Sequence, residues 1–92
     1  MGWIKYDKET LPPVGVEVLA YHHKLVDDYT PEGIRVGFLD GDGEFMSAHW
    51  WDYQDCYITI SKSICEDSPD FYQRLIDNTE PEYWRYMPKF NV

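Results

Sequence analysis

Ser47, His49 and Asp52 stand close together in the segment SAHWWDYQDC, and these three residue types can form a nucleophilic catalytic site. Ser47 and His49 are two positions apart, so on a β-strand their side chains point to the same face. A nucleophile also needs a third group that orients its base; Asp52 is the candidate, and Cys56 is the alternative nucleophile. The sequence contains no glycine-flanked nucleophile turn and no glycine-rich phosphate loop. We therefore expect no catalytic residues and a protein that is not an enzyme.

The histidines and cysteines are the candidates for a metal site. Zinc sites usually combine two pairs of ligands, each pair roughly two to four residues apart. Here eight residues separate Cys56 from Cys65, and the adjacent His22 and His23 would face opposite sides of a strand. At most one of the two histidines would then join a site. The sequence predicts neither a bound metal nor another cofactor, and it favours two reduced cysteines.

The motif DGDGE at residues 40–44 is similar to the start of a calcium-binding loop. Such a loop requires glycine at its sixth position and glutamate at its twelfth. Counted from Asp40, these positions hold Phe45 and Trp51. The motif therefore predicts a turn, in which Asp-Gly tolerates the positive φ of a β-hairpin.

Aromatic residues make up 17% of the chain, and they are the candidates for ligand stacking. The C-terminal segment PEYWRYMPKF alternates like a strand, and we expect Trp84 to face the core and Tyr86 to face outward. Trp50, Trp51 and Tyr53 follow the hairpin and are expected on the surface. There they would stack on a carbohydrate or a nucleotide, or anchor a protein partner.

The net charge of −9 is concentrated in one segment, since residues 40–82 carry eleven acidic and two basic residues. Binding of nucleic acid through its phosphates requires a basic patch, and we expect no direct nucleic-acid binding because the sequence has none. The acidic residues instead suggest a surface that binds a protein, with DNA mimicry as the sharpest form of this hypothesis. The alternative is that the charge only keeps a small protein soluble. The candidate binding residues are Asp40, Asp42, Glu44, Trp50, Trp51, Asp52, Tyr53 and Asp55.

Alternation of apolar and polar residues predicts the strands that position these side chains. The clearest case is residues 34–40, where Ile34, Val36 and Phe38 form one face, and Arg35 and Gly37 form the other. Strands are expected over residues 16–23, 34–40, 44–51, 57–63 and 82–87.

Ser68 and Pro69 provide the start signals of a helix over residues 69–77. We therefore predict an α+β fold with a small antiparallel sheet of four or five strands and one short helix; a mainly β domain is the alternative. The central hairpin spans residues 34–47. The 92 residues are expected to form a single domain. A cytoplasmic location is favoured, because the sequence has neither an apolar membrane span nor a signal-peptide pattern.

An ordered set of short motifs resembles one known family. Trp3 and Ile4 precede LPP-x-G-x-x-VLAY at residues 11–21, and a VGF strand, a DGEF turn and a closing YWRYMP follow. In this order they resemble the phage and prophage family catalogued as domain of unknown function 551. The resemblance covers nearly the whole chain, with residues 47–80 as an insertion that contains a short strand and a helix. Tyr83 and the Lys89-Phe90 end depart from the family pattern.

The resemblance implies a phage-derived or prophage-derived accessory protein, and it assigns no catalytic residue. Together with the charge, it predicts a small non-enzymatic protein that binds a partner protein through its acidic face. The alternative is a ligand-binding module that holds a carbohydrate or a nucleotide with exposed aromatic residues. The sequence leaves the identity of the partner and the oligomeric state open.

Overall fold

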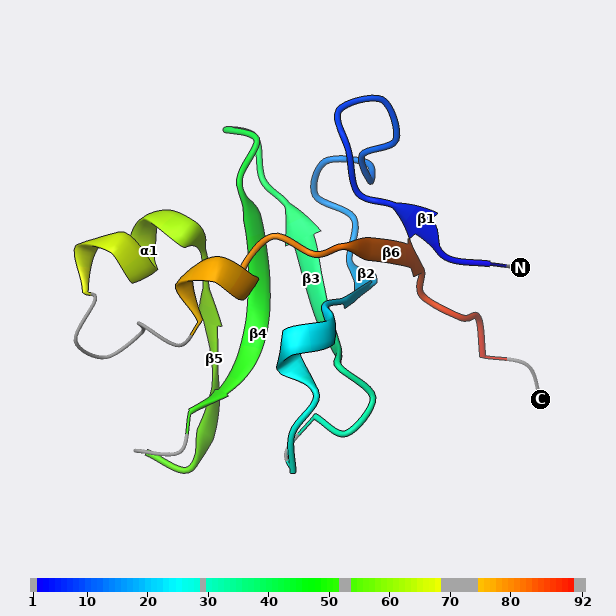
Figure 1. Ribbon diagram of the computed structural model, residues 1–92. Helices are drawn as coiled ribbons and strands as arrows, with labels where there is room; N and C mark the ends of the chain where they lie inside the picture. The colour runs from blue at the N-terminus through cyan, green and yellow to red at the C-terminus, as the bar shows by residue number, and fades with distance from the viewer. Residues whose placement is uncertain (1, 29, 52–53, 69–74, 91–92) are drawn as a thin grey trace.

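The computed structural model describes residues 2–28, 30–51, 54–68 and 75–90, which form a six-stranded antiparallel sheet and short helical segments (Figure 1). The strands lie in the order β1-β6-β2-β3-β4-β5. The prediction of a small antiparallel sheet with a short helix is confirmed, but the sheet has six strands rather than four or five, and the fold is mainly β. The elements are β1 (Ile4–Lys5), β2 (Val18–Tyr21), η1 (His23–Leu25), β3 (Ile34–Leu39), β4 (Phe45–Trp51), β5 (Cys56–Ile60), α1 (Lys62–Asp67), η2 (Ile76–Asn78) and β6 (Tyr83–Tyr86), of which η1 and η2 are single 3-10 turns.

The hairpin of β3 and β4 forms where the Asp-Gly motif predicts it. The Asp40 carboxylate accepts hydrogen bonds from the backbone N–H groups of Asp42 at 3.0 Å and Glu44 at 2.9 Å. Gly43 adopts a φ of 83°, which a residue with a side chain rarely adopts. These local interactions fix the register in which Leu39 pairs with Phe45.

The C-terminal strand β6 lies between β1 and β2, inside the sheet. Trp84 pairs with Ile4 on one side and with Ala20 on the other. Its side chain is 3% exposed, and its indole N–H donates to the carbonyl oxygen of Thr10 at 2.7 Å. The prediction that Trp84 belongs to the core and that Tyr86 is exposed is confirmed.

The α-helix of the described residues precedes the segment in which the sequence predicts one. Most of the predicted helix over residues 69–77 lies outside the described residues, namely 69–74, and its last two residues belong to η2. α1 begins at Lys62, so the predicted strand over residues 57–63 ends at Ile60. Glu44 explains the early start, because its carboxylate accepts hydrogen bonds from the backbone N–H of Ser63 at 2.6 Å and from its hydroxyl at 3.1 Å. A distant side chain thus satisfies a free N–H in the first turn of α1.

The core consists of two apolar clusters on one face of the sheet. Val18, Ala20, Phe45 and Trp84 form the first cluster. The second cluster is formed by Leu25, Ile60, Cys65 and Leu75, and it packs α1 and the segment before η2 against β5. Among the described residues, no helix is long and apolar enough to span a membrane.

The predicted alternation of β3 is confirmed, but its buried face is the one that carries Arg35, Gly37 and Leu39. Ile34, Val36 and Phe38 lie on the opposite face and are only half-buried. Gly37 fits beneath the Phe45 ring, since a Cβ at this position would lie 2.5 Å from Phe45 Cε1. Side-chain size therefore decides which face of β3 packs inward.

Candidate functional site

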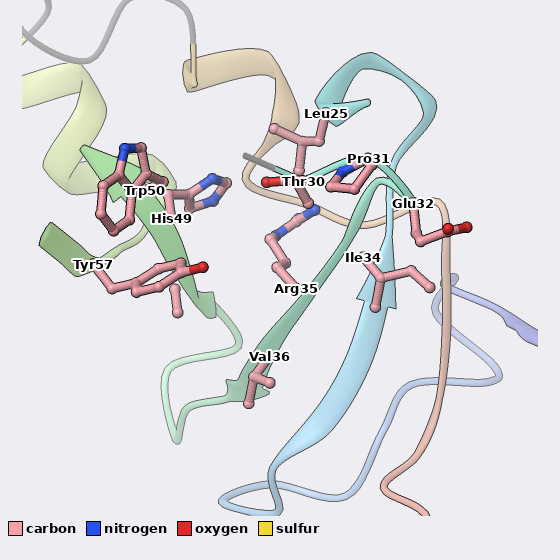
Figure 2. Close-up of a pocket in the computed structure, with 11 residues that line it drawn as sticks. Leu25, Thr30, Pro31, Glu32, Ile34, Arg35, Val36, His49, Trp50 and Tyr57 are labelled. Carbon is pink, nitrogen blue, oxygen red and sulfur yellow. The ribbon is translucent and has the colours of Figure 1, made fainter. Parts of the chain in front are cut away.

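β3 and β4 separate into a fork, and a cavity of about 580 Å³ opens there (Figure 2). The two strands pair from Leu39 and Phe45 as far as Gly37 and Ser47. Beyond this point residues 34–36 pair with β2, whereas residues 48–51 pair with β5. The cavity is lined by Leu25, Thr30, Pro31, Glu32, Ile34, Arg35, Val36, Ala48, His49, Trp50 and Tyr57.

Arg35 is the buried charge at this cavity. Its side chain is only 6% exposed, and its Nη2 donates to the carbonyl oxygens of Asn78 at 2.7 Å and Thr79 at 3.1 Å. Its Nε and Nη1 are buried and have no hydrogen-bond partner among the described residues. Burial lowers the pKa of the guanidinium to about 10, so it remains protonated at neutral pH.

No carboxylate of the described part of the chain forms an ion pair with Arg35. A buried charge is costly unless it is paired and hydrogen-bonded, and two backbone carbonyls provide only part of this compensation. Arg35 therefore contributes an incompletely compensated positive charge to the lining of a cavity that Glu32 also lines, and its two unsatisfied donors are buried. An anion that reached the guanidinium would compensate its charge and accept hydrogen bonds from these donors.

The walls of the cavity are largely apolar and aromatic. Trp50 and Tyr57 are paired across β4 and β5, and their rings meet edge to face with centroids 5.0 Å apart. Trp50 is half-buried, while Tyr57 is 66% exposed. Ile34 and Val36 line the cavity from the β3 side of the fork. The site can accommodate a planar ring as well as an anion.

The predicted neighbours Ser47 and His49 do form a hydrogen bond, with 2.8 Å between Ser47 Oγ and His49 Nε2. However, Ser47 is 0% exposed, so no substrate carbonyl can approach its hydroxyl in this conformation. Asp52, the predicted third member, lies outside the described residues, as does Tyr53. Cys56, the alternative nucleophile, is half-buried at the start of β5 and pairs with Trp51.

The predicted acidic binding residues fall at two ends of one strand. Asp40, Asp42 and Glu44 belong to the turn before β4, whereas Asp55 belongs to the turn after it. The carboxylates of Asp40 and Glu44 also hold the turn and the start of α1.

Of the predicted aromatic residues, Trp50 lines the cavity, and Trp51 pairs with Cys56 at the end of β4.

Arg35 and Tyr57 are two cavity residues that the sequence patterns did not single out as binding residues. One signal was present in the sequence, since Arg35 is the only lysine or arginine between Lys24 and Lys62 and stands inside a strand pattern. Its importance depends on which face of β3 is buried, and alternation alone does not decide that.

The expectation that His22 and His23 face opposite sides of a strand is wrong. β2 ends at Tyr21, and the chain then turns into η1. The two imidazole rings stack with centroids 5.1 Å apart and an interplanar angle of 16°. Both rings lie beside the carboxylate of Glu82.

Comparison with known proteins found no matching family model, no similar curated protein and no similar solved structure. The resemblance to domain of unknown function 551 thus stays a prediction.

Proposed function

We propose that the protein binds a small anionic ligand with a planar ring in the cavity between β3 and β4. The observation that carries this proposal is the buried guanidinium of Arg35, whose Nε and Nη1 lack partners among the described residues. A carboxylate or phosphate oxygen would accept charge-assisted hydrogen bonds from these groups. Leaving them unpaired costs free energy, which gives the anion its advantage over a neutral ligand.

The residues that line the cavity favour a ligand that contains a planar ring. Trp50 and Tyr57 provide aromatic surface. In proteins that bind single-stranded nucleic acid, a base stacked on an aromatic side chain contributes about 1–3 kcal/mol. The volume of about 580 Å³ is in the usual range for small-molecule sites. Nucleotides and aromatic carboxylates combine these two features, so they are the ligand classes that we propose.

The proposed activity is binding rather than catalysis. Among the described residues, Ser47 and His49 are the one nucleophile–base pair near the cavity, and the Ser47 hydroxyl is buried. An accessory role in a phage or prophage, which the sequence resemblance implies, is compatible with a ligand-binding protein. We therefore propose a non-enzymatic module.

Matched pairs of ligands test the need for negative charge. Titrations followed by tryptophan fluorescence and by NMR amide shifts would compare AMP with adenosine and benzoate with benzamide. Each pair shares a ring and differs in charge. We expect the anion of at least one pair to bind about tenfold or more tightly than its neutral analogue, because only the anion pairs with Arg35. Equal affinity within both pairs, or no binding by any of the four, would contradict the proposal.

Matched variants locate the bound ligand. Arg35→Lys keeps the charge but changes the donor geometry, and it should weaken the anion; Arg85→Lys is the control, because Arg85 lies over the Trp3 ring, away from the cavity residues. Tyr57→Ala should also weaken binding, whereas Tyr83→Ala removes an exposed tyrosine from β6 and should not. Circular dichroism of each variant separates lost binding from lost folding.

The second candidate function is the binding of a partner protein, which the sequence predicts. The half-buried residues Phe38 and Met46 are paired on the open face of the sheet, next to the acidic turn that contains Asp42. An apolar patch beside charged residues is typical of protein interfaces, and a partner with a basic rim would complement it. This proposal predicts that a basic partner captured from bacterial lysate is lost when Phe38→Ser is combined with Asp42→Asn. Capture that Asp28→Asn weakens equally would argue against this surface.

A further inference from the structure

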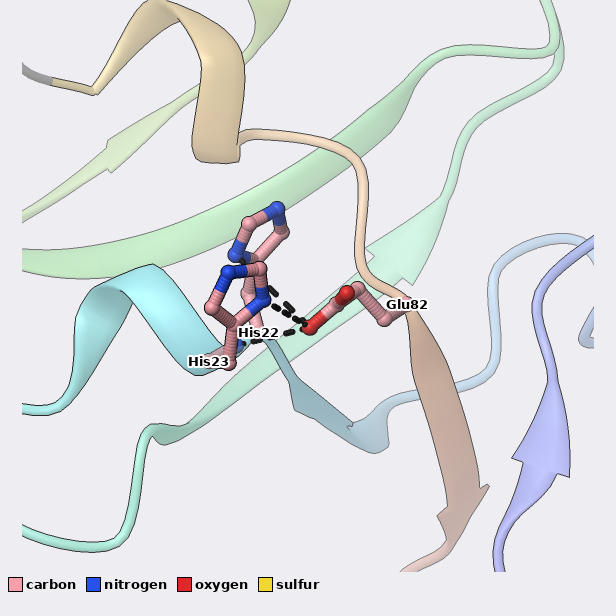
Figure 3. Close-up of side chains that lie close together, drawn as sticks. All are labelled: His22, His23 and Glu82. Carbon is pink, nitrogen blue, oxygen red and sulfur yellow. Dashed lines mark hydrogen bonds and ion pairs between the residues drawn. The ribbon is translucent and has the colours of Figure 1, made fainter.

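His22, His23 and Glu82 form a cluster of potential metal ligands at one end of β2 and β6 (Figure 3). His23 Nδ1 lies 2.8 Å from Glu82 Oε1, and His22 Nδ1 lies 3.9 Å from the same oxygen. The three ligand atoms are all within 4.8 Å of one another. Two histidines that are adjacent in sequence thus meet a carboxylate 59 residues later.

The pairing of the sheet holds this cluster in place. The β2–β6 ladder ends with Tyr21 opposite Tyr83, so the next position on each strand brings residue 22 near residue 82. The backbone N–H of Glu82 donates to the Tyr21 carbonyl at 2.8 Å, and its own carbonyl accepts from Tyr6 N–H at 3.0 Å. The carboxylate also accepts the backbone N–H of His23 at 2.8 Å. The three side chains are therefore positioned by the fold.

We propose that His22, His23 and Glu82 bind a divalent transition-metal ion, with Zn²⁺ as the best chemical match. Two imidazoles and one carboxylate are a ligand set that proteins use for zinc, and they leave at least one coordination position open. Tetrahedral coordination at about 2.0–2.1 Å from the ion places two ligand atoms about 3.3–3.4 Å apart. The separations of 2.8 Å and 3.9 Å lie on either side of this value, so metal binding requires small shifts of the side chains. The side chains of His23 and Glu82 are 59% and 36% exposed, so the ion can enter from solvent.

The electrostatics of the cluster favour ligation on balance. His22 Nδ1 accepts the backbone N–H of Lys24, so it has the unprotonated lone pair that a metal requires. The Glu82 carboxylate contacts the backbone N–H and the imidazole of His23, and such hydrogen bonds favour its ionised form. Lys24 and Arg35 also act on His22 and oppose a bound cation. The ionised Glu82 carboxylate is the negative charge in direct contact that offsets them.

Metal binding would replace specific hydrogen bonds. His22 Nδ1 now accepts the backbone N–H of Lys24 at 3.1 Å, and that bond would be lost. His23 Nδ1 now faces an ionised carboxylate and must carry a proton. That proton would move to Nε2 on the same ring as Nδ1 takes the metal, so no redox step is involved. The backbone amides of His23 and Lys24 are the expected reporters.

The experiment uses the full chain without a histidine tag. Calorimetry with Zn²⁺ should give saturable binding of one ion, and Co²⁺ should give the visible absorption of a nitrogen- and oxygen-ligated site. In NMR spectra Zn²⁺ should shift the His23 and Lys24 amides first. No saturable binding at millimolar Zn²⁺ would overturn the proposal. A thiolate charge-transfer band with Co²⁺ would also overturn it, because the ligands would then include Cys56 or Cys65.

Variants of His23 and Glu82 test whether these two residues are ligands. His23→Ala and Glu82→Gln should each weaken Zn²⁺ binding by about 10–100-fold or more, since each removes a direct ligand. Glu44→Gln is the matched control, because Glu44 also accepts a backbone N–H and a side-chain hydrogen bond but has no histidine neighbour in the cluster. Unchanged affinity in His23→Ala and Glu82→Gln, with thermal unfolding like that of the unmodified protein, would refute the assignment.

Discussion

Arg35 donates from Nη2 to the carbonyl oxygen of Asn78 at 2.7 Å, across 43 residues of sequence. The same group donates to Thr79, so one side chain of β3 fixes the segment that connects η2 to β6. The remaining donors of this guanidinium are buried without a partner among the described residues, and Arg35 also lines the cavity. The residue proposed to hold the ligand therefore also links the sheet to the segment that covers it.

This double role predicts a loss of stability when Arg35 is changed to lysine. A lysine ammonium keeps the charge but is a point donor, and it cannot reproduce the planar geometry that reaches both carbonyls. Leaving a buried carbonyl without its donor should lower the free energy of unfolding by about 1–3 kcal/mol. Urea unfolding measures the change. An unaltered midpoint and slope would mean that the bonds to Asn78 and Thr79 contribute little to stability.

Gly37→Ala tests the close packing beneath Phe45. An added Cβ would lie 2.5 Å from Phe45 Cε1 and 2.6 Å from the Met46 carbonyl oxygen, which is backbone and cannot rotate away. We expect a loss of about 3 kcal/mol in the free energy of unfolding, at the upper end for overpacked cores. The control is Gly41→Ala in the hairpin turn, where a Cβ meets no atom within 4 Å. If both variants unfold at the same urea concentration, β3 packs differently from this description.

Trp84→Ala should be severely destabilising, by about 3–5 kcal/mol, because the ring is buried in the first apolar cluster. Trp84→Phe keeps most of the apolar surface but removes the donor to the Thr10 carbonyl, so its loss should be smaller. Chemical unfolding of the two variants separates the packing contribution from the hydrogen bond. A loss below about 1 kcal/mol for Trp84→Ala would place this residue outside the core.

The parts of the fold that local sequence determines are the parts that could be predicted. The hairpin turn depends on Asp40 and its neighbours within four residues, and the edge strand β5 depends on the alternation of Ile58 and Ile60 with Tyr57. Trp84 belongs to the core, as predicted, because a large ring in a strand of a small domain stabilises the fold most when its apolar surface is buried.

The remainder depends on contacts between distant residues. α1 begins at Lys62 because Glu44 binds Ser63, 19 residues later, whereas its N-cap residue Ser61 makes no side-chain capping hydrogen bond. Arg35 is buried because it shares a face of β3 with Gly37. Gly37 has no side chain, so this face packs closely against Phe45. The histidine pair meets Glu82 only because β6 inserts between β1 and β2.

Stability at high pH should report the environment of Tyr6. Its pKa is raised to about 12, first by burial and then by the negative charges of Glu80 and Asp40. The unfolded chain ionises near pH 10, so the folded state holds its proton more tightly, and its advantage is complete below pH 10 and is lost as the pH rises towards 12. Urea unfolding at several pH values in this window should therefore show a steeper loss of stability for the unmodified protein than for Tyr6→Phe, which cannot ionise but keeps the ring against Phe45. Parallel pH profiles for the two proteins would show that the Tyr6 phenol is solvated in the folded state.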